Sequence, residues 1–301
     1  MYKRQGTGNP APTLTSISPT SGTANGGTPV TITGTGFLAG ATVSLGGTAA
    51  TGVTVVSSTS ITATTAAHTA GAVSVVVTNS DAQTGTLTNG YTYTASTGGT
   101  ISFVQVKAAT PQTASSSVAL TYTAAQTAGN LNIVVVGWND TTSTVSGVTD
   151  SKGNTYALAI GPTSGTGLRQ SIYYAKNIAS GSNTVTVTFN QAAAFVDIRI
   201  LEYSGLDTAS PLDKTAGAAG AGTTASSGAA TTTSATELIF GAEMTTQTTT
   251  GPGSGFVSRI ITSPDTDIAE DKIVSATGSY SATAAVTSSN WVMQMVTFKT
   301  P

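Results

Sequence analysis

The sequence predicts an all-β chain built from stacked sheets, on three observations. Only 8% of the residues are charged, against about 25% in an average globular protein. Val and Ile alternate with Thr and Ser in short runs such as 73–78, which is the pattern of a strand with one buried face. Gly, Ser and Asn clusters separate these runs, and 34 residues are glycine. We therefore expect many short strands joined by tight turns.

The composition changes along the chain and predicts two domains of unequal size. Residues 11–94 contain one formal charge, whereas 12 of the 13 acidic residues and both tryptophans lie in 101–301. The Gly/Ser/Thr-rich segment 95–100 has the character of a linker. Residues 1–10 carry two positive charges near the start and lack the apolar core of a secretory signal. We expect them to be a non-native or disordered leader of a fragment whose own signal has been lost.

The first domain begins with a clear half-buried strand. Val30 and Ile32 are expected to point inward and Thr31 and Thr33 outward, and the glycines that follow permit the positive φ angles of a turn. About seven short strands in roughly 85 residues fit an immunoglobulin-like sandwich. The clearest strand signals are at 30–37, 41–45, 52–56, 60–62, 73–78 and 91–93.

This segment resembles the TIG/IPT domain, an immunoglobulin-like domain of plexins, some transcription factors and many bacterial surface proteins. The motifs that carry the resemblance are Ile17-Ser-Pro19, Gly26-Gly-Thr28, Val30-Thr-Ile-Thr-Gly-x-Gly-Phe37, Gly40-Ala-x-Val43, Gly46-Gly47, Val75-x-Val-Thr-Asn79 and Tyr91-Thr-Tyr93. Members in transcription factors bind DNA through basic loops, but residues 11–94 contain no Lys or Arg. The resemblance therefore implies a spacer or adhesive role.

The second domain, 101–301, is expected to be a larger two-sheet sandwich of jelly-roll type. Residues 131–138 are apolar on both faces and should form a central strand, whereas 216–234 consist only of Ala, Gly, Thr and Ser and predict a long loop or a weak edge strand. The other strand signals are at 101–107, 118–122, 155–160, 171–177, 184–189, 196–203, 237–244, 256–262, 267–275 and 291–299.

The second domain is also similar to one found beside TIG domains in environmental bacterial proteins. The residues that carry this likeness are Val-Val-Gly-Trp-Asn-Asp140, Val148-Thr-Asp-Ser-Lys-Gly-Asn-Thr-Tyr156, Tyr173-Tyr-Ala-Lys176 and Ile200-Leu-Glu-Tyr-Ser-Gly205. The likeness implies an architecture and no activity.

Charge and composition exclude several classes of partner. The net charge is −2 and the basic residues are scattered singly, so no basic face exists to neutralise nucleic acid phosphates. The absence of cysteine removes disulfides and thiolate chemistry, and no apolar stretch is long enough to span a membrane. These properties favour an extracellular or cell-surface location on a bacterium, and they leave the oligomeric state open.

Catalytic signals are weak. The only histidine, His68, lies before a glycine turn in the first domain and is expected to be a turn residue. Glu202 and Glu243 lie in otherwise apolar strands and could serve as the carboxylate pair of a glycoside hydrolase. The favoured interpretation is instead an ion pair of either carboxylate with Arg169 or Arg199.

Two binding hypotheses remain. The acidic run of Asp265, Asp267, Glu270 and Asp271 offers hard oxygen ligands for calcium, although a solvated turn is the favoured interpretation and no other cofactor is indicated. A sugar could bind on a platform that begins where the strand 131–138 ends. Against this, a Trp at a strand end usually closes a core. The platform residues are Trp138, Asn139, Asp140, Tyr156 and Tyr280.

We therefore expect a non-catalytic module of the bacterial cell surface, in which the TIG domain spaces and the second domain binds polysaccharide or surface glycan. The first alternative is a fragment of a polysaccharide-acting glycoside hydrolase. The second alternative is a subunit of a surface assembly, which would require self-association through exposed strand edges or apolar patches.

Overall fold

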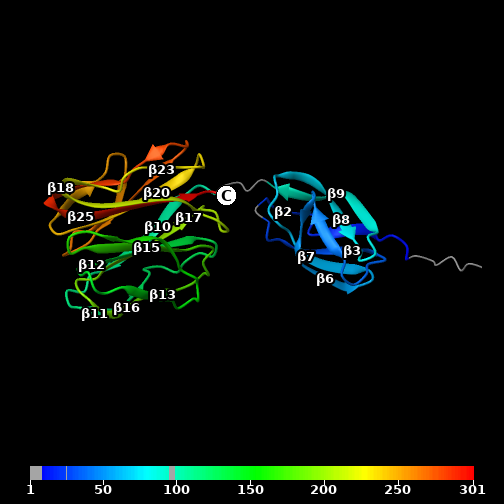
Figure 1. Ribbon diagram of the computed structural model, residues 1–301, viewed down its shortest axis with the longest axis horizontal. Helices are drawn as coiled ribbons and strands as arrows, with labels where there is room; N and C mark the ends of the chain where they lie inside the picture. The colour runs from blue at the N-terminus through cyan, green and yellow to red at the C-terminus, as the bar shows by residue number, and fades with distance from the viewer. Residues whose placement is uncertain (1–8, 25, 95–98) are drawn as a thin grey trace, which may run out of the picture. The chain divides into compact units, whose positions relative to one another are not determined.

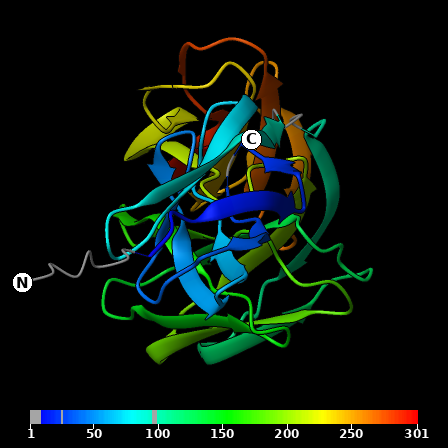
Figure 2. The same ribbon diagram turned by 90° about the vertical axis from the view of Figure 1, so that its right-hand side faces the viewer.

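The structure is a computed structural model and describes residues 9–24, 26–94 and 99–301. In this part of the chain it contains strands and loops and no helix, as Figures 1 and 2 show, so no helix there could cross a membrane. The chain divides into two compact units between residues 97 and 98. The expected leader, 1–10, falls largely outside the described residues, as does most of the linker, 95–100.

The first unit is an immunoglobulin-like sandwich of two sheets, which confirms the predicted fold. One sheet has the order β1-β3-β7-β6 and the other β2-β9-β8-β4-β5. The strands are β1 (Thr13–Ser18), β2 (Ser21–Thr23), β3 (Pro29–Thr35), β4 (Thr42–Leu45), β5 (Thr48–Ala49), β6 (Thr51–Ser57), β7 (Ser60–Thr64), β8 (Gly71–Thr78) and β9 (Thr84–Thr94).

The alternation of β3 sets the packing of this unit. Val30 and Ile32 are buried and Thr31 and Thr33 are exposed, as predicted. Gly34 continues the buried face because β1 passes very close: a Cβ at this position would lie 2.0 Å from the carbonyl oxygen of Thr13. Hydroxyl side chains thus cover the outside of the sheet while aliphatic side chains fill the core.

The second unit has three stacked sheets and a separate two-stranded sheet, β19-β24. The central sheet has the order β10-β17-β12-β15-β14, the small sheet β11-β16-β13, and the large sheet β18-β25-β20-β23-β22, with β21 paired to β25. The strands of the first half are β10 (Ser102–Ala109), β11 (Ser115–Thr121), β12 (Leu131–Trp138), β13 (Val145–Asp150), β14 (Ala157–Ser164), β15 (Arg169–Ala175), β16 (Thr184–Ala193) and β17 (Asp197–Ser204). Those of the second half are β18 (Leu212–Ser226), β19 (Ala230–Thr231), β20 (Glu237–Thr245), β21 (Thr249–Pro252), β22 (Val257–Ile261), β23 (Ile268–Val274), β24 (Ser279–Tyr280) and β25 (Thr283–Lys299).

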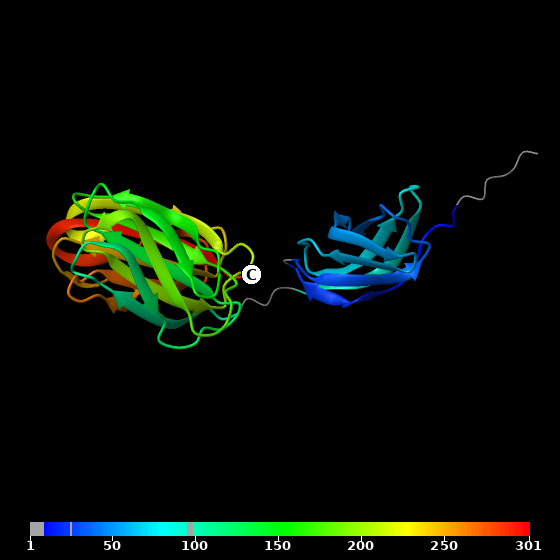
Figure 3. The ribbon, with the colours of Figure 1, turned by 90° about the horizontal axis from the view of Figure 1, so that it is seen from below.

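The central sheet is covered on both faces, as its position between the other two layers in Figure 1 indicates. One face of β12, with Ile133 and Val135, packs against the large sheet. The other face, with Val134 and Val136, packs against the small sheet, which is the layer nearest the viewer in Figure 3. The apolar run at 131–138 is therefore central, as predicted. The expected all-β sandwich is confirmed, with three layers in place of the two expected, because a strand buried on both faces needs a covering layer on each side.

The Ala/Gly/Thr segment is mostly an edge strand. β18 pairs with β25 along the border of the large sheet, and Gly220 lies against the ring of Trp291, where a Cβ would come within 2.5 Å of the indole. The small residues are thus required where the strand crosses a large side chain.

Candidate functional site

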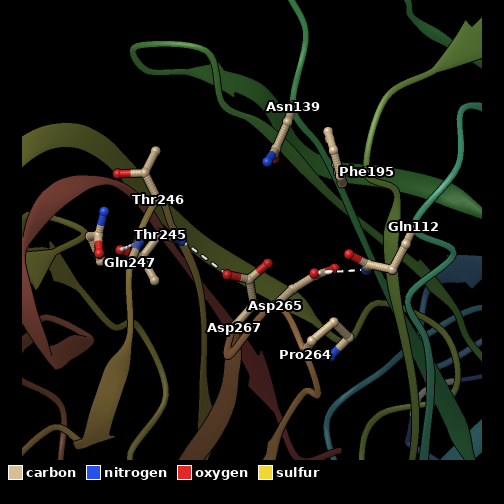
Figure 4. Close-up of a pocket in the computed structure, with 9 residues that line it drawn as sticks. All are labelled: Gln112, Asn139, Phe195, Thr245, Thr246, Gln247, Pro264, Asp265 and Asp267. Carbon is tan, nitrogen blue, oxygen red and sulfur yellow. Dashed lines mark hydrogen bonds between the residues drawn. The ribbon is translucent and has the colours of Figure 1, made fainter.

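A cleft of about 310 Å³ opens at one end of the second unit, where the loops of the central and large sheets meet. It lies beside the last residues of β12 and β20 and the loops that precede β17 and β23. Figure 4 shows Asn139 pointing toward the carboxylates of Asp265 and Asp267, with Phe195 beside them. The lining residues are Gln112, Asn139, Phe195, Thr245, Thr246, Gln247, Pro264, Asp265 and Asp267.

Two residues of this region have unusual backbone conformations. Phe195 has a φ of 44° and Thr266 a φ of 63°, in the left-handed region that bulky and β-branched residues rarely adopt. Phe195 precedes β17 and its side chain is 49% exposed. Such conformations cost energy and are often found at binding and catalytic sites. Their presence in the cleft loops is the reason to consider the cleft as a candidate site.

A fully buried arginine lies behind the cleft. The Nε atom of Arg199, on β17, is 2.8 Å from Oδ1 of Asp197, and both side chains have no exposed area. Neither atom meets hydrogen-bond geometry with a partner among the described residues, so this contact is an ion pair. Arg199 also donates to the carbonyl oxygen of Glu243 at 2.9 Å and to Oε1 of Gln170 at 3.0 Å. The guanidinium thus ties the central sheet to the large sheet.

Carboxylates outnumber cations around Arg199. Asp267 is 2% exposed and accepts a hydrogen bond from the backbone N–H of Thr245 at 3.0 Å. Burial raises the pKa of Asp267 well above its usual range, and the nearby carboxylate of Asp197 raises it further. Asp265 accepts from Gln112 at 2.8 Å through Oδ1, while its buried Oδ2 has no partner within the described part of the chain. The cleft is therefore lined by the carboxyl group of Asp267, whose uncharged form is favoured by burial, and by the carboxylate of Asp265.

Of the five predicted sugar-binding residues, Asn139 alone lines the cleft. Trp138 is 1% exposed and packs edge-on against Phe189, with ring centroids 5.6 Å apart. It closes the core between the central and small sheets and offers no face for stacking. Asp140 accepts hydrogen bonds from Thr142, Ser143 and Ala194. These bonds lower the pKa of Asp140 to about 2 against the opposing effect of burial, so Asp140 orders its loop.

The two predicted tyrosines are engaged elsewhere. The hydroxyl of Tyr156 donates to Asp150 at 3.0 Å and accepts from Asn132 at 3.1 Å, and burial, followed by the charge of Asp150, raises the pKa of Tyr156. Tyr280 lies on β24 and donates to the carbonyl oxygen of Ala276 at 2.8 Å. Phe195 and the amides of Gln112 and Gln247 were not predicted, because single polar or aromatic residues in loops carry no periodic signal.

The structure does not assemble Glu202 and Glu243 into a carboxylate pair. Glu202 is held in the interior of the second unit by the side-chain amides of Gln105 and Asn130 and the backbone N–H of Thr127. Glu243 accepts from Thr249 at 2.6 Å. Burial raises its pKa to about 7, opposed by this bond and by the charge of Arg199.

The two carboxylates therefore face different layers. Glu202 pairs across the central sheet with Asn132 and shares the side of that sheet that packs on the small sheet, whereas Glu243 shares a side of β20 with Ile239, away from the central sheet. The expected side-chain ion pairs with arginine do not form either. Arg199 contacts Glu243 only through its backbone carbonyl, and Arg169 donates to the carbonyl oxygen of Ser143.

The acidic run 265–271 separates into different environments. Asp265 and Asp267 border the cleft, Glu270 accepts from the N–H of Gly253 at 2.8 Å, and Asp271 forms an ion pair with Arg259 at 2.7 Å. Within the described ranges, no three His, Cys, Asp or Glu side chains are grouped to hold a metal ion. Calcium binding by these residues stays a prediction, and calorimetry without heat on calcium addition would remove it.

His68 lies in the loop before β8 of the first unit. Its ring stacks on Tyr93, with centroids 5.0 Å apart, and its Nδ1 lies 2.8 Å from the carbonyl oxygen of Thr69.

Comparison with known proteins identifies the first unit. Residues 12–95 match the family described as IPT/TIG domain, so this segment is an IPT/TIG domain, a β-sandwich module of the immunoglobulin type. The match covers the first unit and not the second. A comparison with curated proteins finds no match.

Two of the solved structures that match the chain illustrate a limited similarity. One is the full extracellular region of plexin A4, with 17% identity and a TM-score of 0.26, covering 61% of this chain and 13% of that chain. The other is SGBP-B from a complex xyloglucan utilization locus in Bacteroides uniformis, with 12% identity and a TM-score of 0.25, covering 64% of this chain and 72% of that chain. At such TM-scores neither likeness bears on the function of this protein.

Proposed function

We propose that this chain is a non-catalytic module of the bacterial cell surface, in which the TIG domain spaces and the second unit binds carbohydrate in the cleft. The observation that carries the proposal is the exposed ring of Phe195 beside the amide of Asn139 and the carboxylates of Asp265 and Asp267. A sugar has an apolar ring face that stacks on an aromatic side chain, and hydroxyls that donate to amide and carboxylate oxygens.

The charge of the cleft selects among glycans. Two carboxyl groups, of Asp265 and Asp267, line it, and the cation behind them, Arg199, is already paired with Asp197. Burial favours the uncharged form of Asp267, so the negative charge facing a ligand is that of Asp265. This charge would repel an acidic polysaccharide, whereas a neutral or amino sugar meets oxygen acceptors for its hydroxyl or ammonium groups. We therefore expect neutral or amino glycans to bind, and uronate-rich glycans to bind weakly or not at all.

The test is affinity electrophoresis and isothermal titration calorimetry of the full chain against soluble neutral, amino and uronate polysaccharides. Phe195→Ala should weaken binding of the best glycan at least about tenfold, which corresponds to about 1.4 kcal/mol. The control is Leu158→Ala, which removes an apolar side chain of similar exposure, 48%, from β14. Equal affinity of the Phe195→Ala variant and the unaltered chain would contradict the proposal, as would a panel without any binding.

A further inference from the structure

The edge strand β18 differs from the other strand edges in the described residues. Within these residues it pairs with β25 alone, so the hydrogen-bonding groups along its outer side lack a strand partner. From Thr215 to Gly222 its register with β25 is unbroken over eight residues. Its only charged residues are Asp213 and Lys214, which precede this regular run, and the strand contains no proline.

The other edge strands carry features that prevent pairing with a further strand. Proteins protect such edges with short length, bulges, charged residues or proline. β2 and β5 have three and two residues, while β10 carries Lys107, β22 carries Arg259 and β14 carries Pro162. The registers of β1, β6, β11 and β13 are interrupted by bulges or irregularities. β18 carries Asp213 and Lys214 near its start and register shifts at 212–215 and 222–224. Between these features, the run from Thr215 to Gly222 is the longest regular edge in the described part of the chain, and this run has no charge, proline or bulge.

A second observation marks the same place. Gly220 lies within the regular run, and its backbone packs closely against the indole ring of Trp291. Trp291 is 9% exposed, and its Nε1 has no hydrogen-bond partner among the described residues. Because Ala219, Gly220 and Ala221 have little or no side chain and are exposed, another backbone can approach closely, and the border of the sheet retains an unsatisfied buried donor nearby.

We propose that β18 is a self-association edge, at which β18 of a second copy of this chain pairs antiparallel to form a continuous sheet across a two-fold axis. A second copy fits best because the run from Thr215 to Gly222 has neither charges nor large side chains with which to select a different sequence. Small side chains facing their own symmetry mates produce no clash and no like-charge repulsion, which is what an isologous interface requires. The interface lies along the large sheet and does not use the lining residues of the cleft.

The oligomeric state of the full chain tests the proposal. Sedimentation equilibrium over a range of concentrations should reveal a dimer, and Ala221→Lys, which places a charge on the edge, should raise its dissociation constant at least tenfold. The control is Ala119→Lys, the same substitution at an exposed position of the edge strand β11, which should leave the dimer unchanged. A chain that stays monomeric at every concentration would overturn the proposal, and so would a dimer that Ala221→Lys does not weaken.

The absence of cysteine permits a second test of the geometry. Single cysteines at 215, 217, 219 and 221 should form intermolecular disulfides most readily at one position and progressively less on either side, because a two-fold axis places one residue opposite itself. Equal cross-linking at all four positions would show random collision and overturn the antiparallel pairing. Circular dichroism of each variant verifies that it folds. These results are independent of glycan binding, so either proposal can fail without the other.

Discussion

Removal of the buried guanidinium by Arg199→Met should destabilise the second unit severely. Asp197 would remain fully buried, with the hydroxyl of Thr262 at 2.7 Å as its hydrogen-bond partner. The carbonyl oxygen of Glu243 and Oε1 of Gln170 would each lose a donor. Loss of one partner from a buried ion pair costs about 3 to 5 kcal/mol, which corresponds to a fall in Tm of roughly 6 to 20 °C for a unit of this size.

Urea denaturation followed by tryptophan fluorescence measures this cost directly, because both tryptophans lie in the second unit. The control is Arg169→Met, which removes an arginine from β15 whose guanidinium donates to a single backbone carbonyl at 3.3 Å. We expect it to cost about 1 kcal/mol. The double variant Asp197→Asn/Arg199→Met should recover part of the loss, because it removes the unpaired charge.

Two results would refute the reasoning. One is a cost below about 1 kcal/mol for Arg199→Met at pH 8, which would mean that water reaches the guanidinium. The other is a double variant less stable than Arg199→Met, which would mean that the unpaired carboxylate of Asp197 does not cause the loss of stability.

Three further predictions concern other parts of the second unit. Gly220→Ala should lower the free energy of unfolding by about 1 to 3 kcal/mol and alter the fluorescence of Trp291, because the new Cβ would lie 2.5 Å from the ring. The control is Gly251→Ala, which should change little because a Cβ there would have no atom within 4 Å. Equal effects of the two substitutions in urea denaturation would contradict this prediction. The pKa of Glu243 is raised to about 7 by burial, so its contribution to stability is present below about pH 4.5 and lost as the pH rises to 7, by about 3 kcal/mol. Glu243→Gln should flatten that part of the stability profile, and an unchanged profile would count against the assignment. Asp140→Ala should lower the free energy of unfolding by about 1 to 3 kcal/mol. Because the pKa of Asp140 is lowered to about 2, the effect of the substitution should disappear as the pH falls from about 4 to 2. A loss of stability that persists at pH 2 would show that the hydrogen bonds of the Asp140 carboxylate are not its cause.

The fold class and most of the central strands of the first unit could be predicted from its residues, whereas the edge strands β1, β2 and β5 were not predicted. Alternation in 30–35 specifies which face of β3 is buried, and the glycines and motifs around it place the turns, because these are local properties of neighbouring residues. The same local reasoning located 131–138 as a strand buried on both faces, and β12 has those bounds. The short strands β19, β21 and β24 were not predicted, and neither was β13, where Gly147 interrupts a short run of small residues beside a bulge.

The stacking of sheets and the cleft depended on contacts between distant segments. The apolar pattern of β12 requires cover on both faces but does not say which strands supply it, so the third sheet could not be predicted. Glu202 and Glu243 both occur in apolar strands, yet the side of each sheet on which they lie depends on how the sheets stack. The cleft collects residues from loops more than 150 positions apart, from Gln112 to Asp267. The alternation of apolar and polar residues by itself therefore determined which side chains each strand buries. Only the tertiary structure decided which loops meet, because loop residues have no periodic pattern in the sequence that would indicate their contacts.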